Sequence, residues 1–459
     1  MTAEPAPSVL HLFSGLGGGA LGFRRAGFRS VGAIDSCPDA CADFRLLVGE
    51  EATTADIMAM TPDDLRRVCP ESPDVLFTSP PCKGFSGCLP EAKAATDRYK
   101  NLNSLALHGV WLAMLAWERK PRMIVLENVP RIMSRGREWL RLLREMLQSY
   151  GYAVDESTHD CAAMGGLAQH RRRFLLVARH MDQVPAFIRA PAEKPTRTIA
   201  DVLGSLPVPD ADGGGAGPMH ALPKLSALNW VRLALIPAGQ DWHALPASVA
   251  LPKRGGRPNG PYGVERWDGP SHAVLGHAKS RDTWASVADP RLGCEPHRGT
   301  YGVHDWNGAS KTVRGHHNIN NAPAAVADPR GAGRWVVRDG AVSGPPLDIE
   351  DKRPTRMQIE ASDGTWHRPF TTLELAALQG LPTEAEDGSP LVLTGRSHGA
   401  WRQRIGNAVP PQVGEAIGRA CAAALAAADT GAWVLSADAI WVRPERGVDG
   451  KLAVSTMPA

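Results

Sequence analysis

The sequence predicts an α/β protein built on a mostly parallel sheet, and three segments favour this class. Residues 9–13 form a short apolar segment, a glycine-rich turn over residues 14–19 follows at once, and helix-forming residues come next. A strand, a glycine turn and a helix N-terminus in this order are typical of a nucleotide-type binding fold. Residues 31–35 and 123–126 are further apolar segments, and an acid ends the first and follows the second.

The chemically active residues are expected at one edge of this sheet. Asp35 follows the glycine turn by about 20 residues, the spacing at which a carboxylate reaches ribose hydroxyl groups. A helix cap ahead of Pro38 is its alternative role. Cys82 lies in the loop after a strand predicted at residues 74–77, and Glu127 lies at the end of another predicted strand. Ligands of open α/β sheets bind at the carboxyl ends of the strands, so Asp35, Cys82 and Glu127 should converge.

Cys82 and Glu127 together indicate covalent chemistry at an electron-poor ring. A thiolate can add to a ring carbon, while a carboxylic acid binds the ring nitrogen that takes up charge. Pro80 and Pro81 restrict the loop before the thiol, and Gly84 lets the backbone approach a substrate closely. A cysteine alone would be weak evidence, because most cysteines are buried small apolar residues.

The composition limits the class of protein and its compartment. Of the 459 residues, 43% are apolar and 22% are charged, so the chain can bury a sizeable core and has room for two or three domains. It has no apolar run of about 18 residues and no charged start followed by an apolar stretch, so membrane spanning and export are not expected. The eight cysteines lack the paired spacing of a metal site, which favours free thiols in a reducing cytoplasm and no metal. A net charge of +3 permits a nucleic-acid partner without requiring one.

Six motifs, in order along the chain, resemble those of the DNA cytosine-5 methyltransferase family. They lie at residues 11–18, 79–86, 126–130, 169–174, 368–382 and 403–410. The second motif contains Pro80-Pro81-Cys82 and the third contains Glu127-Asn128-Val129, where this family carries its nucleophile and its acid. The resemblance implies a Rossmann-like, S-adenosylmethionine-dependent sheet with an inserted small, β-rich target-recognition domain.

By this resemblance, the chain transfers a methyl group from S-adenosyl-L-methionine to C5 of a flipped-out cytosine in double-stranded DNA. Cys82 adds to C6 and Glu127 acts at N3. Asn128 would orient Glu127, and Arg173 would hold the base carbonyl, with Arg171 in the same catalytic set. The resemblance assigns further residues to the cofactor: Phe13, Ser14, Gly15, Leu16, Gly17, Gly18, Asp35, Ser36, Asp56, Ile57, Pro80, Asn407, Ala408 and Val409. We expect a monomer.

Lys83 replaces the glutamine that the family usually has beside the nucleophile, and it leaves the transferred group open. Its ammonium could face DNA phosphate, or it could pair with the carboxylate of carboxy-S-adenosyl-L-methionine, in which case a carboxymethyl group is transferred. An RNA cytosine-5 methyltransferase and a non-catalytic DNA-binding protein are further alternatives. The long middle region favours DNA, whose groove edges need a large reading surface, and the presence of Cys82, Glu127 and Arg173 favours an enzyme. His11 also departs from the family, which usually has aspartate there.

The chain divides into four expected segments. They are a catalytic and cofactor-binding domain at residues 1–184, a target-recognition domain at 185–365, a segment completing the catalytic domain at 366–428, and an appendage of unknown role at 429–459. The middle region contains a duplication, because residues 260–291 recur 39 residues later as 299–330 with 16 of 32 positions identical. We expect each copy to form a small strand-turn-strand element.

Overall fold

The computed structural model contains two compact units. It describes residues 6–81, 97–184, 187–236, 245–246, 249, 253–254, 257–258, 264–266, 286–288, 303–305, 307–312, 325–328, 335–338, 341–344, 347–350, 353–361, 366–431 and 440–442. One unit comprises residues 1–197 with 376–459, and the other comprises residues 198–375. The second unit is therefore inserted into the sequence of the first. The roles that the sequence assigns to its four segments remain predictions.

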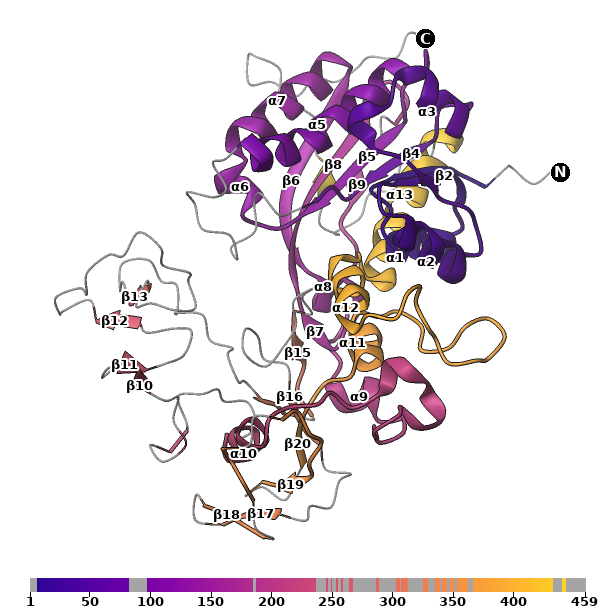
Figure 1. The fold of residues 1–459 in the computed structure, drawn as a ribbon. Coiled ribbons are helices and arrows are strands. Elements are labelled where there is room, and N and C mark those ends of the chain that lie inside the picture. Colours follow the sequence, from indigo (N-terminus) through magenta and orange to yellow (C-terminus); the bar gives the residue numbers. More distant parts are fainter. Residues whose placement is uncertain are drawn as a thin grey trace. The chain divides into compact units, whose positions relative to one another are not determined.

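A seven-stranded sheet forms the centre of the first unit (Figure 1). Its strands are β1 (Ser8–Leu12), β2 (Arg29–Asp35), β3 (Thr53–Thr54), β4 (Val75–Thr78), β5 (Met123–Asn128), β6 (Tyr152–Asp160) and β8 (Arg172–His180). They lie in the order β3-β2-β1-β4-β5-β8-β6. β8 runs antiparallel to both of its neighbours, and the other neighbouring strands pair in parallel. The predicted mostly parallel α/β class is confirmed.

Helices and short strands complete the first unit. They are α1 (Gly18–Arg25), α2 (Pro38–Val48), η1 (Ile57–Ala59), α3 (Pro62–Val68), α5 (Asp97–Ala116), α6 (Ile132–Arg135), α7 (Arg137–Ser149), α8 (Cys161–Gly165), β7 (Gln169–His170), β9 (Ile188–Arg189), α12 (His398–Asn407), α13 (Pro411–Thr430) and β21 (Ile440–Val442). β21, in the expected appendage, pairs antiparallel with β9. α11 (Thr372–Leu378) crosses the boundary between the units. Among the described residues, no helix is both long enough and apolar enough to cross a bilayer.

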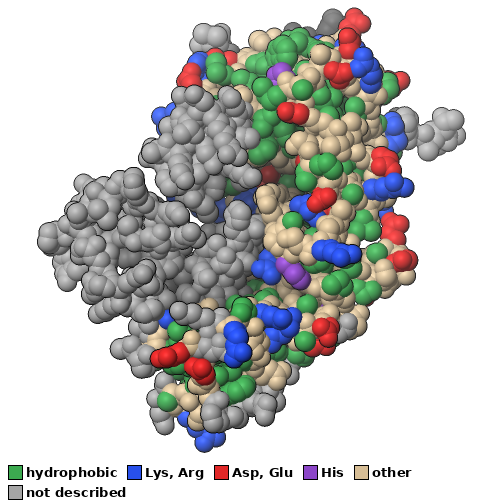
Figure 2. All heavy atoms as spheres, in the orientation of Figure 1, with side chains coloured by type: hydrophobic (Ala, Val, Ile, Leu, Met, Phe, Trp, Pro, Cys, Tyr) green, Lys and Arg blue, Asp and Glu red, His purple; other side chains and the backbone are tan. Residues whose placement is uncertain are grey.

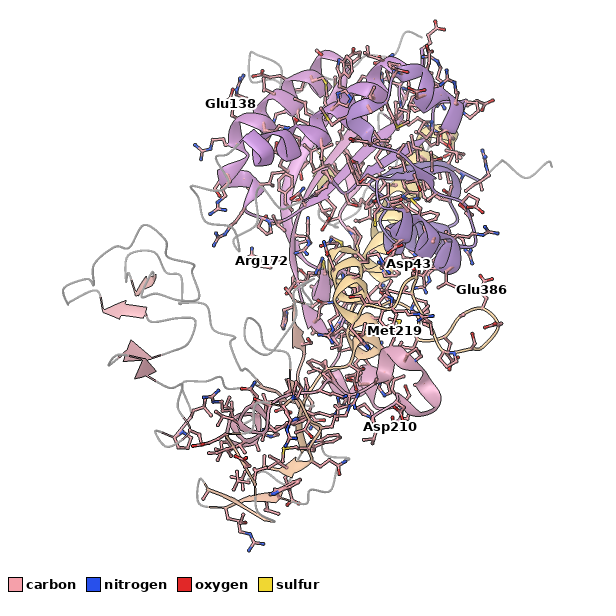
Figure 3. All side chains as sticks on the ribbon, viewed as in Figure 1. Asp43, Glu138, Arg172, Asp210, Met219 and Glu386 are labelled. Carbon is pink, nitrogen blue, oxygen red and sulfur yellow. The ribbon has the colours of Figure 1, made fainter. Side chains whose placement is uncertain are left out.

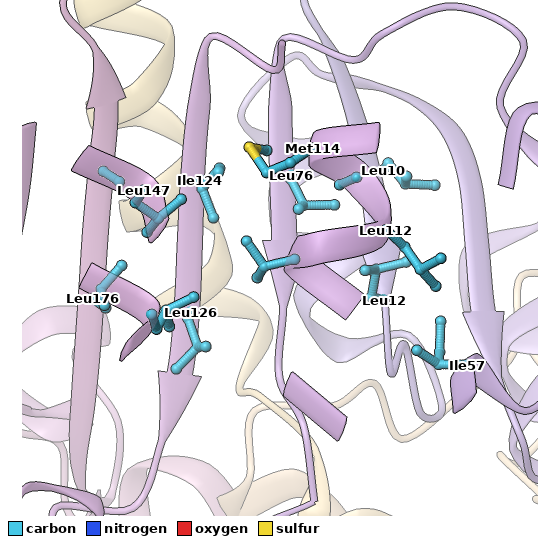
Figure 4. Close-up of a cluster of buried hydrophobic side chains, with 14 of the residues drawn as sticks. Leu10, Leu12, Ile57, Leu76, Leu112, Met114, Ile124, Leu126, Leu147 and Leu176 are labelled. Carbon is cyan, nitrogen blue, oxygen red and sulfur yellow. The ribbon is translucent and has the colours of Figure 1, made fainter. Parts of the chain in front are cut away.

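The two faces of the seven-stranded sheet carry separate apolar cores. Ile124 and Leu126 of β5 face α5 and α7, where they pack with Met114 and Leu147 (Figure 4). Val125, between them, belongs to the core formed with α1 and α13. This alternation follows from the period of two of a β-strand. Because both faces are covered, β1, β4 and β5 are buried along their whole length, which is why they are rich in apolar residues.

The second unit contains a six-stranded sheet, and α10 (Ala227–Leu235) packs with it. In sheet order the strands are β14 (Val303–His304), β16 (Ala325–Asp328), β20 (Trp366–Pro369), β19 (Ile359–Glu360), β17 (Trp335–Arg338) and β18 (Ala341–Ser343). Trp230 of α10 and Trp366 of β20 are buried and stacked, with ring centroids 6.4 Å apart. The other elements are α9 (Ile199–Leu203), η2 (Gly214–Ala216), η3 (Pro218–His220), β10 (Lys253–Arg254), β11 (Arg257–Pro258), β12 (Val264–Arg266), β13 (Ser286–Ala288) and β15 (Ser310–Lys311).

Both copies of the duplicated sequence make the same strand pairing. In the first copy, β12 pairs in parallel with β13, with Val264 opposite Ser286. In the second copy, β14 pairs in parallel with β16, with Val303 opposite Ala325. The two registers differ by the 39-residue period of the duplication. This parallel pairing differs from what a strand-turn-strand element suggests, because a tight turn joins antiparallel strands.

Candidate active site

The loops that follow β1, β4 and β5 are tied together at one edge of the sheet. These strands are parallel, so their carboxyl ends meet there. The Ser79 hydroxyl after β4 donates to the carbonyl of Phe13 after β1, at 3.2 Å. The Asn128 side chain at the end of β5 donates to the carbonyl of Pro80, also at 3.2 Å. Pro81 follows, and Cys82 and Lys83, the next two residues, lie outside the described part of the chain.

Asp35 holds the glycine turn from the end of β2. Its Oδ2 accepts a hydrogen bond from the amide of Gly15 at 2.9 Å, and its Oδ1 accepts one from the amide of Cys37 at 2.9 Å. Cys37 is the N-cap residue of α2, so Asp35 supports the start of that helix without being its cap. Phe13, just before the turn, has a φ of 55°, a left-handed conformation that is uncommon for a non-glycine residue.

Gly17 and Gly18 are required by packing. A Cβ atom at Gly18 would lie 2.2 Å from the carbonyl oxygen of Val409, so the start of α1 rests directly on the backbone before α13. A Cβ atom at Gly17 would lie 2.5 Å from Val48 of α2. The glycine turn therefore packs against α2 and against Val409, which the sequence assigns to the cofactor.

Ser14 and Gly15 have the surroundings expected of a ligand-binding turn. A Cβ atom at Gly15 would meet no atom within 4 Å, so open space lies on that side of the backbone. The hydroxyl of Ser14 is buried and has no hydrogen-bond partner among the described residues. Buried polar groups are normally hydrogen-bonded, so an unpartnered hydroxyl beside open space fits a polar ligand such as a nucleoside cofactor.

The other residues assigned to the cofactor divide into exposed and buried ones. Ser36 is exposed, and so is Asp56, whose carboxylate accepts a hydrogen bond from the amide of Met58 at 3.0 Å and caps η1. Ile57 is buried in the core with α5, and Leu16 is buried as well. The side chains of Ile57 and Leu16 therefore contribute to packing.

Glu127 and Arg173 form an ion pair across two neighbouring strands. The register of β5 and β8 sets Glu127 opposite Leu175, so Arg173, two residues away on β8, lies diagonally across on the same face. The Nε of Arg173 is 2.8 Å from Oε1 of Glu127. Their side chains are only 14% and 11% exposed, so water screens this pair weakly.

Asn128 contacts the loop after β4 and its own neighbour. Its Nδ2 donates to Pro80, and its Oδ1 accepts a hydrogen bond from the amide of Val129 at 2.8 Å. We expected Asn128 to orient Glu127, but consecutive strand residues point to opposite faces of a sheet. The described contact that orients Glu127 comes from Arg173.

Arg171 and Gln379 hold the segment that connects α12 to α13. The buried guanidinium of Arg171 donates from Nη2 to the carbonyl of Gly406 at 2.8 Å and to that of Ala408 at 3.4 Å. Gln379 donates to the same Ala408 carbonyl at 2.5 Å. Ala408 and Val409 are buried, whereas Asn407 is exposed. Arg171 thus supports the backbone of the segment that the sequence assigns to the cofactor.

Asp43, Thr394 and Arg404 form a buried polar cluster that was not predicted from the sequence. Asp43 is completely buried on α2, and Arg404 on α12 lies 2.6 Å from it. A signal was present, because Asp43 is an acid on the helix face that also carries the buried residues Ala40 and Phe44. An acid on an apolar helix face indicates a buried partner.

Most described cysteines are buried thiols with raised pKa values. Burial raises the pKa of Cys69 and of Cys161 to about 11 and that of Cys421 to about 12, and it also raises the pKa of Cys41. Such thiols are poor nucleophiles at neutral pH. Cys37 is exposed. Within the described part of the chain, no cluster of three or more His, Cys, Asp or Glu residues could hold a metal ion.

Surface charge is mixed around this part of the molecule. On the face drawn in Figure 2, lysine and arginine side chains are interspersed with acidic ones. Two exposed arginines flank the site in sequence, because Arg131 follows β5 and Arg172, labelled in Figure 3, precedes Arg173. Charge alone therefore does not mark a nucleic-acid surface, in agreement with the small net charge of +3.

Comparison with known protein families gives a match over most of the chain. A family model described as C-5 cytosine-specific DNA methylase matches residues 8–212 and 274–423. The Type II methyltransferase M.XorII of Xanthomonas oryzae is 33% identical over 233 residues, which cover 49% of this chain and 50% of that protein. The Type II methyltransferase M1.HphI of Haemophilus parahaemolyticus is 26% identical over 245 residues, 53% of this chain and 64% of that protein. The matches thus span about half to two thirds of these relatives.

Solved structures share the fold at low sequence identity. The Entamoeba histolytica methyltransferase EhMeth aligns with a TM-score of 0.56 at 13% identity, covering 91% of this chain and 98% of that one. A mutant of the Spodoptera frugiperda DNMT2 aligns with a TM-score of 0.55 at 14% identity, covering 91% and 99%. These likenesses concern the fold alone.

Proposed function

Because the chain belongs to the C-5 cytosine-specific DNA methylase family, we propose that it is a DNA cytosine-5 methyltransferase of the restriction-modification type. The substrate is double-stranded DNA, and the product carries a methyl group on C5 of a cytosine. The main structural support for this proposal is the largely buried ion pair between Glu127 and Arg173 at the carboxyl end of β5. The loop that leads to Cys82 is held beside it by the hydrogen bond from Asn128 to Pro80.

The target base must leave the DNA stack before it can react. Stacking shields the faces of a cytosine in a duplex, so the enzyme flips the nucleotide into its site. There, Arg173 holds the base carbonyl while its contact with Glu127 keeps the carboxyl group beside N3. Two oriented groups reduce the entropic part of the activation barrier.

Cys82 provides the nucleophile. Its thiolate adds to C6, and Glu127 supplies a proton or a hydrogen bond at N3, where negative charge develops. The electron density thereby gained makes C5 nucleophilic. After transfer, a water-mediated base removes the proton from C5, and the electron pair of that C–H bond expels the Cys82 thiolate. Asn128 supports this step by fixing the Pro80 carbonyl, two residues before the nucleophile.

The glycine turn and the segment before α13 would hold S-adenosyl-L-methionine. When bound, this cofactor supplies the methyl group as the electrophilic carbon of a sulfonium. Ser14, Gly15 and Asp35 line one side through the free hydroxyl, the open backbone and the carboxylate. Residues 407–409 line the other side, and the contact of Gly18 with Val409 supports this arrangement.

The second unit is proposed to read the DNA sequence. It is inserted between the two parts of the catalytic unit and contributes none of the residues assigned to chemistry. Reading base edges requires an additional surface, because contacts to the phosphate backbone carry no direct sequence information. We propose that a single copy of the chain acts on DNA.

The experiment that tests the function is an in vitro reaction followed by analysis of the nucleosides. Purified protein is incubated with unmethylated DNA and S-adenosyl-L-methionine, and in parallel with carboxy-S-adenosyl-L-methionine. Digestion and mass spectrometry should detect 5-methylcytosine from the first reaction and no carboxymethylcytosine from the second. Absence of a modified cytosine with either cofactor would exclude the proposed activity. A carboxymethyl product would instead support the alternative in which Lys83 binds the carboxylate of carboxy-S-adenosyl-L-methionine.

A further inference from the structure

A buried ion pair joins two distant parts of the first unit. The Nε of Arg404, on α12, donates to Oδ2 of Asp43 on α2 at 2.6 Å (Figure 3 labels Asp43). The other oxygen of Asp43 accepts a hydrogen bond from the amide of Thr394 at 2.6 Å. Arg404 also donates to the carbonyl of Thr394 and lies 3.2 Å from the carboxylate of Asp39. Asp43 is fully buried, and the Arg404 side chain is 9% exposed.

Each partner lies on a helix that is adjacent in sequence to residues proposed to bind the cofactor. α2 begins at Pro38, directly after the Asp35 loop, and Asp43 lies on its buried face. α12 ends at Asn407, three residues after Arg404, and continues into the segment that Gly18 contacts. The ion pair therefore connects α2, which follows Asp35 on one side of the proposed cofactor site, to α12, which leads into residues 407–409 on the opposite side.

We infer that Asp43 and Arg404 are positioning residues for the cofactor, which set the distance between the Asp35 loop and residues 407–409. The inference rests on the proposed function, because it takes S-adenosyl-L-methionine as the ligand. Arg171 and Gln379 fix residues 406–408 at their backbone. The Asp43–Arg404 pair links α12 to α2.

A merely stabilising role is a weaker explanation for this pair. Burying two charges costs several kcal/mol per ion in lost hydration, so a buried ion pair is often no more stable than apolar packing of the same size. The geometry is nevertheless specific, because both carboxylate oxygens and three guanidinium nitrogens have defined partners. Such a pair constrains the relative placement of two helices more than it adds to stability.

Three variants separate positioning from folding. Arg404→Gln removes the cation, Arg404→Lys keeps the charge but loses the planar fork, and Asp43→Asn combined with Arg404→Gln leaves two neutral amides and no unpaired buried charge. The single Gln variant should lose thermal stability, and the double variant should regain most of it. All three should bind S-adenosylhomocysteine about tenfold more weakly in calorimetry without DNA. The KM for cofactor should rise in parallel, while kcat at saturating cofactor and the KM for DNA stay near their wild-type values.

Arg122→Gln provides the matched control. Arg122 also forms a long-range ion pair, with Asp429 at the end of α13, but it lies immediately before β5, at the opposite edge of the sheet. The substitution is chemically identical to Arg404→Gln. It should lower the thermal midpoint and leave the affinity for S-adenosylhomocysteine unchanged.

The outcomes distinguish this inference from the function on which it rests. Wild-type affinity in all three variants would overturn the positioning role while the proposed function stands. So would a double variant that regains cofactor affinity together with stability, because the pair would then act through folding alone. A wild-type protein that binds no S-adenosylhomocysteine and methylates no DNA would contradict the proposed function itself.

Discussion

His11 illustrates how one polar side chain in an apolar environment couples stability to pH. It is 1% exposed on β1, with its ring edge-on to Phe23 at 5.7 Å and to Phe77 at 5.8 Å. Its Nε2 is buried and has no hydrogen-bond partner among the described residues. Burial disfavours the charged imidazolium and lowers the pKa of His11 to about 3.

This pKa predicts a loss of stability in mild acid. Between pH 6.5 and about 3, the unfolded chain binds a proton at His11 that the folded chain does not bind. The contribution to stability is complete above pH 6.5 and falls by up to about 1.4 kcal/mol per pH unit below it. The free energy of unfolding can be measured by urea titration at pH 7.5 and at pH 5.5. Between these two pH values it should fall by roughly 1 kcal/mol less in His11→Leu than in the wild type. The two proteins differ in ionisable groups only at position 11, so equal losses would contradict this assignment.

Individual site residues could be predicted from sequence to different degrees. Glu127 and Arg173 were singled out from two separate motifs, and the structure brings their side chains into contact; their roles in the reaction stay predictions. The contact of Asn128 was not predicted, because the sequence shows that two residues are adjacent but not which sheet face meets the loop after β4. The role of Arg171 likewise depends on residues 406–408, more than 230 positions away.

At the scale of elements, the contact between α1 and the segment before α13 shapes the proposed cofactor site. Backbone approaches backbone there, with space for no side chain at Gly18. α1 and α13 also share the apolar core on their face of the sheet. A side chain at Gly18 would therefore displace residues 408–409 from the glycine turn.

Gly18→Ala should weaken cofactor binding although alanine favours helices. The added methyl group would overlap the Val409 carbonyl, and overpacking of this kind costs about 1–3 kcal/mol. Calorimetry should detect weaker binding of S-adenosylhomocysteine and a lower thermal midpoint. Gly399→Ala is the control, because Gly399 also lies in a helix, α12, and a Cβ atom there would meet only the Ser397 hydroxyl at 3.6 Å. That variant should keep full affinity, and an equal loss in both would refute the packing argument.

Strands without a continuous apolar sequence were the hardest elements to predict. The strands β1, β2, β4 and β5 are apolar and could be located from residues 9–13, 31–35, 74–77 and 123–126. β6 lies at the edge of the sheet and carries polar residues over most of its length, so its sequence lacks an apolar signal. The parallel pairing within each repeat also escaped prediction, because turn signals suggest a local connection and cannot indicate a crossover.

At the scale of the whole molecule, the duplication supplies two equivalent strand pairs. The second copy is built into the six-stranded sheet, where β16 also pairs with β20. The first copy forms its own two-stranded sheet of β12 and β13. Removing one full period should therefore leave one complete copy in the sheet.

Deletion of residues 260–298 tests this equivalence. It removes 39 residues and keeps β14, β16 and their pairing with β20, so the protein should stay folded and retain methyltransferase activity. Deletion of residues 286–328 removes a similar length but takes β13, β14 and β16 together, which leaves β20 with β19 as its one neighbour in the sheet. Circular dichroism and thermal melting should find the first protein cooperative and the second destabilised. A first deletion that fails to fold would mean that the copies depend on each other.

Cys82 is proposed to form the covalent bond to the target cytosine, and trapping that bond tests the proposal most directly. Duplex DNA with 5-fluorocytosine at the methylated position cannot lose its C5 substituent, so the adduct should accumulate when protein and S-adenosyl-L-methionine are added. Peptide mapping by mass spectrometry should locate the DNA on Cys82. Cys82→Ser should form no adduct but still bind S-adenosylhomocysteine. Attachment at another cysteine such as Cys37, or no adduct from a protein that methylates unsubstituted DNA, would contradict the account.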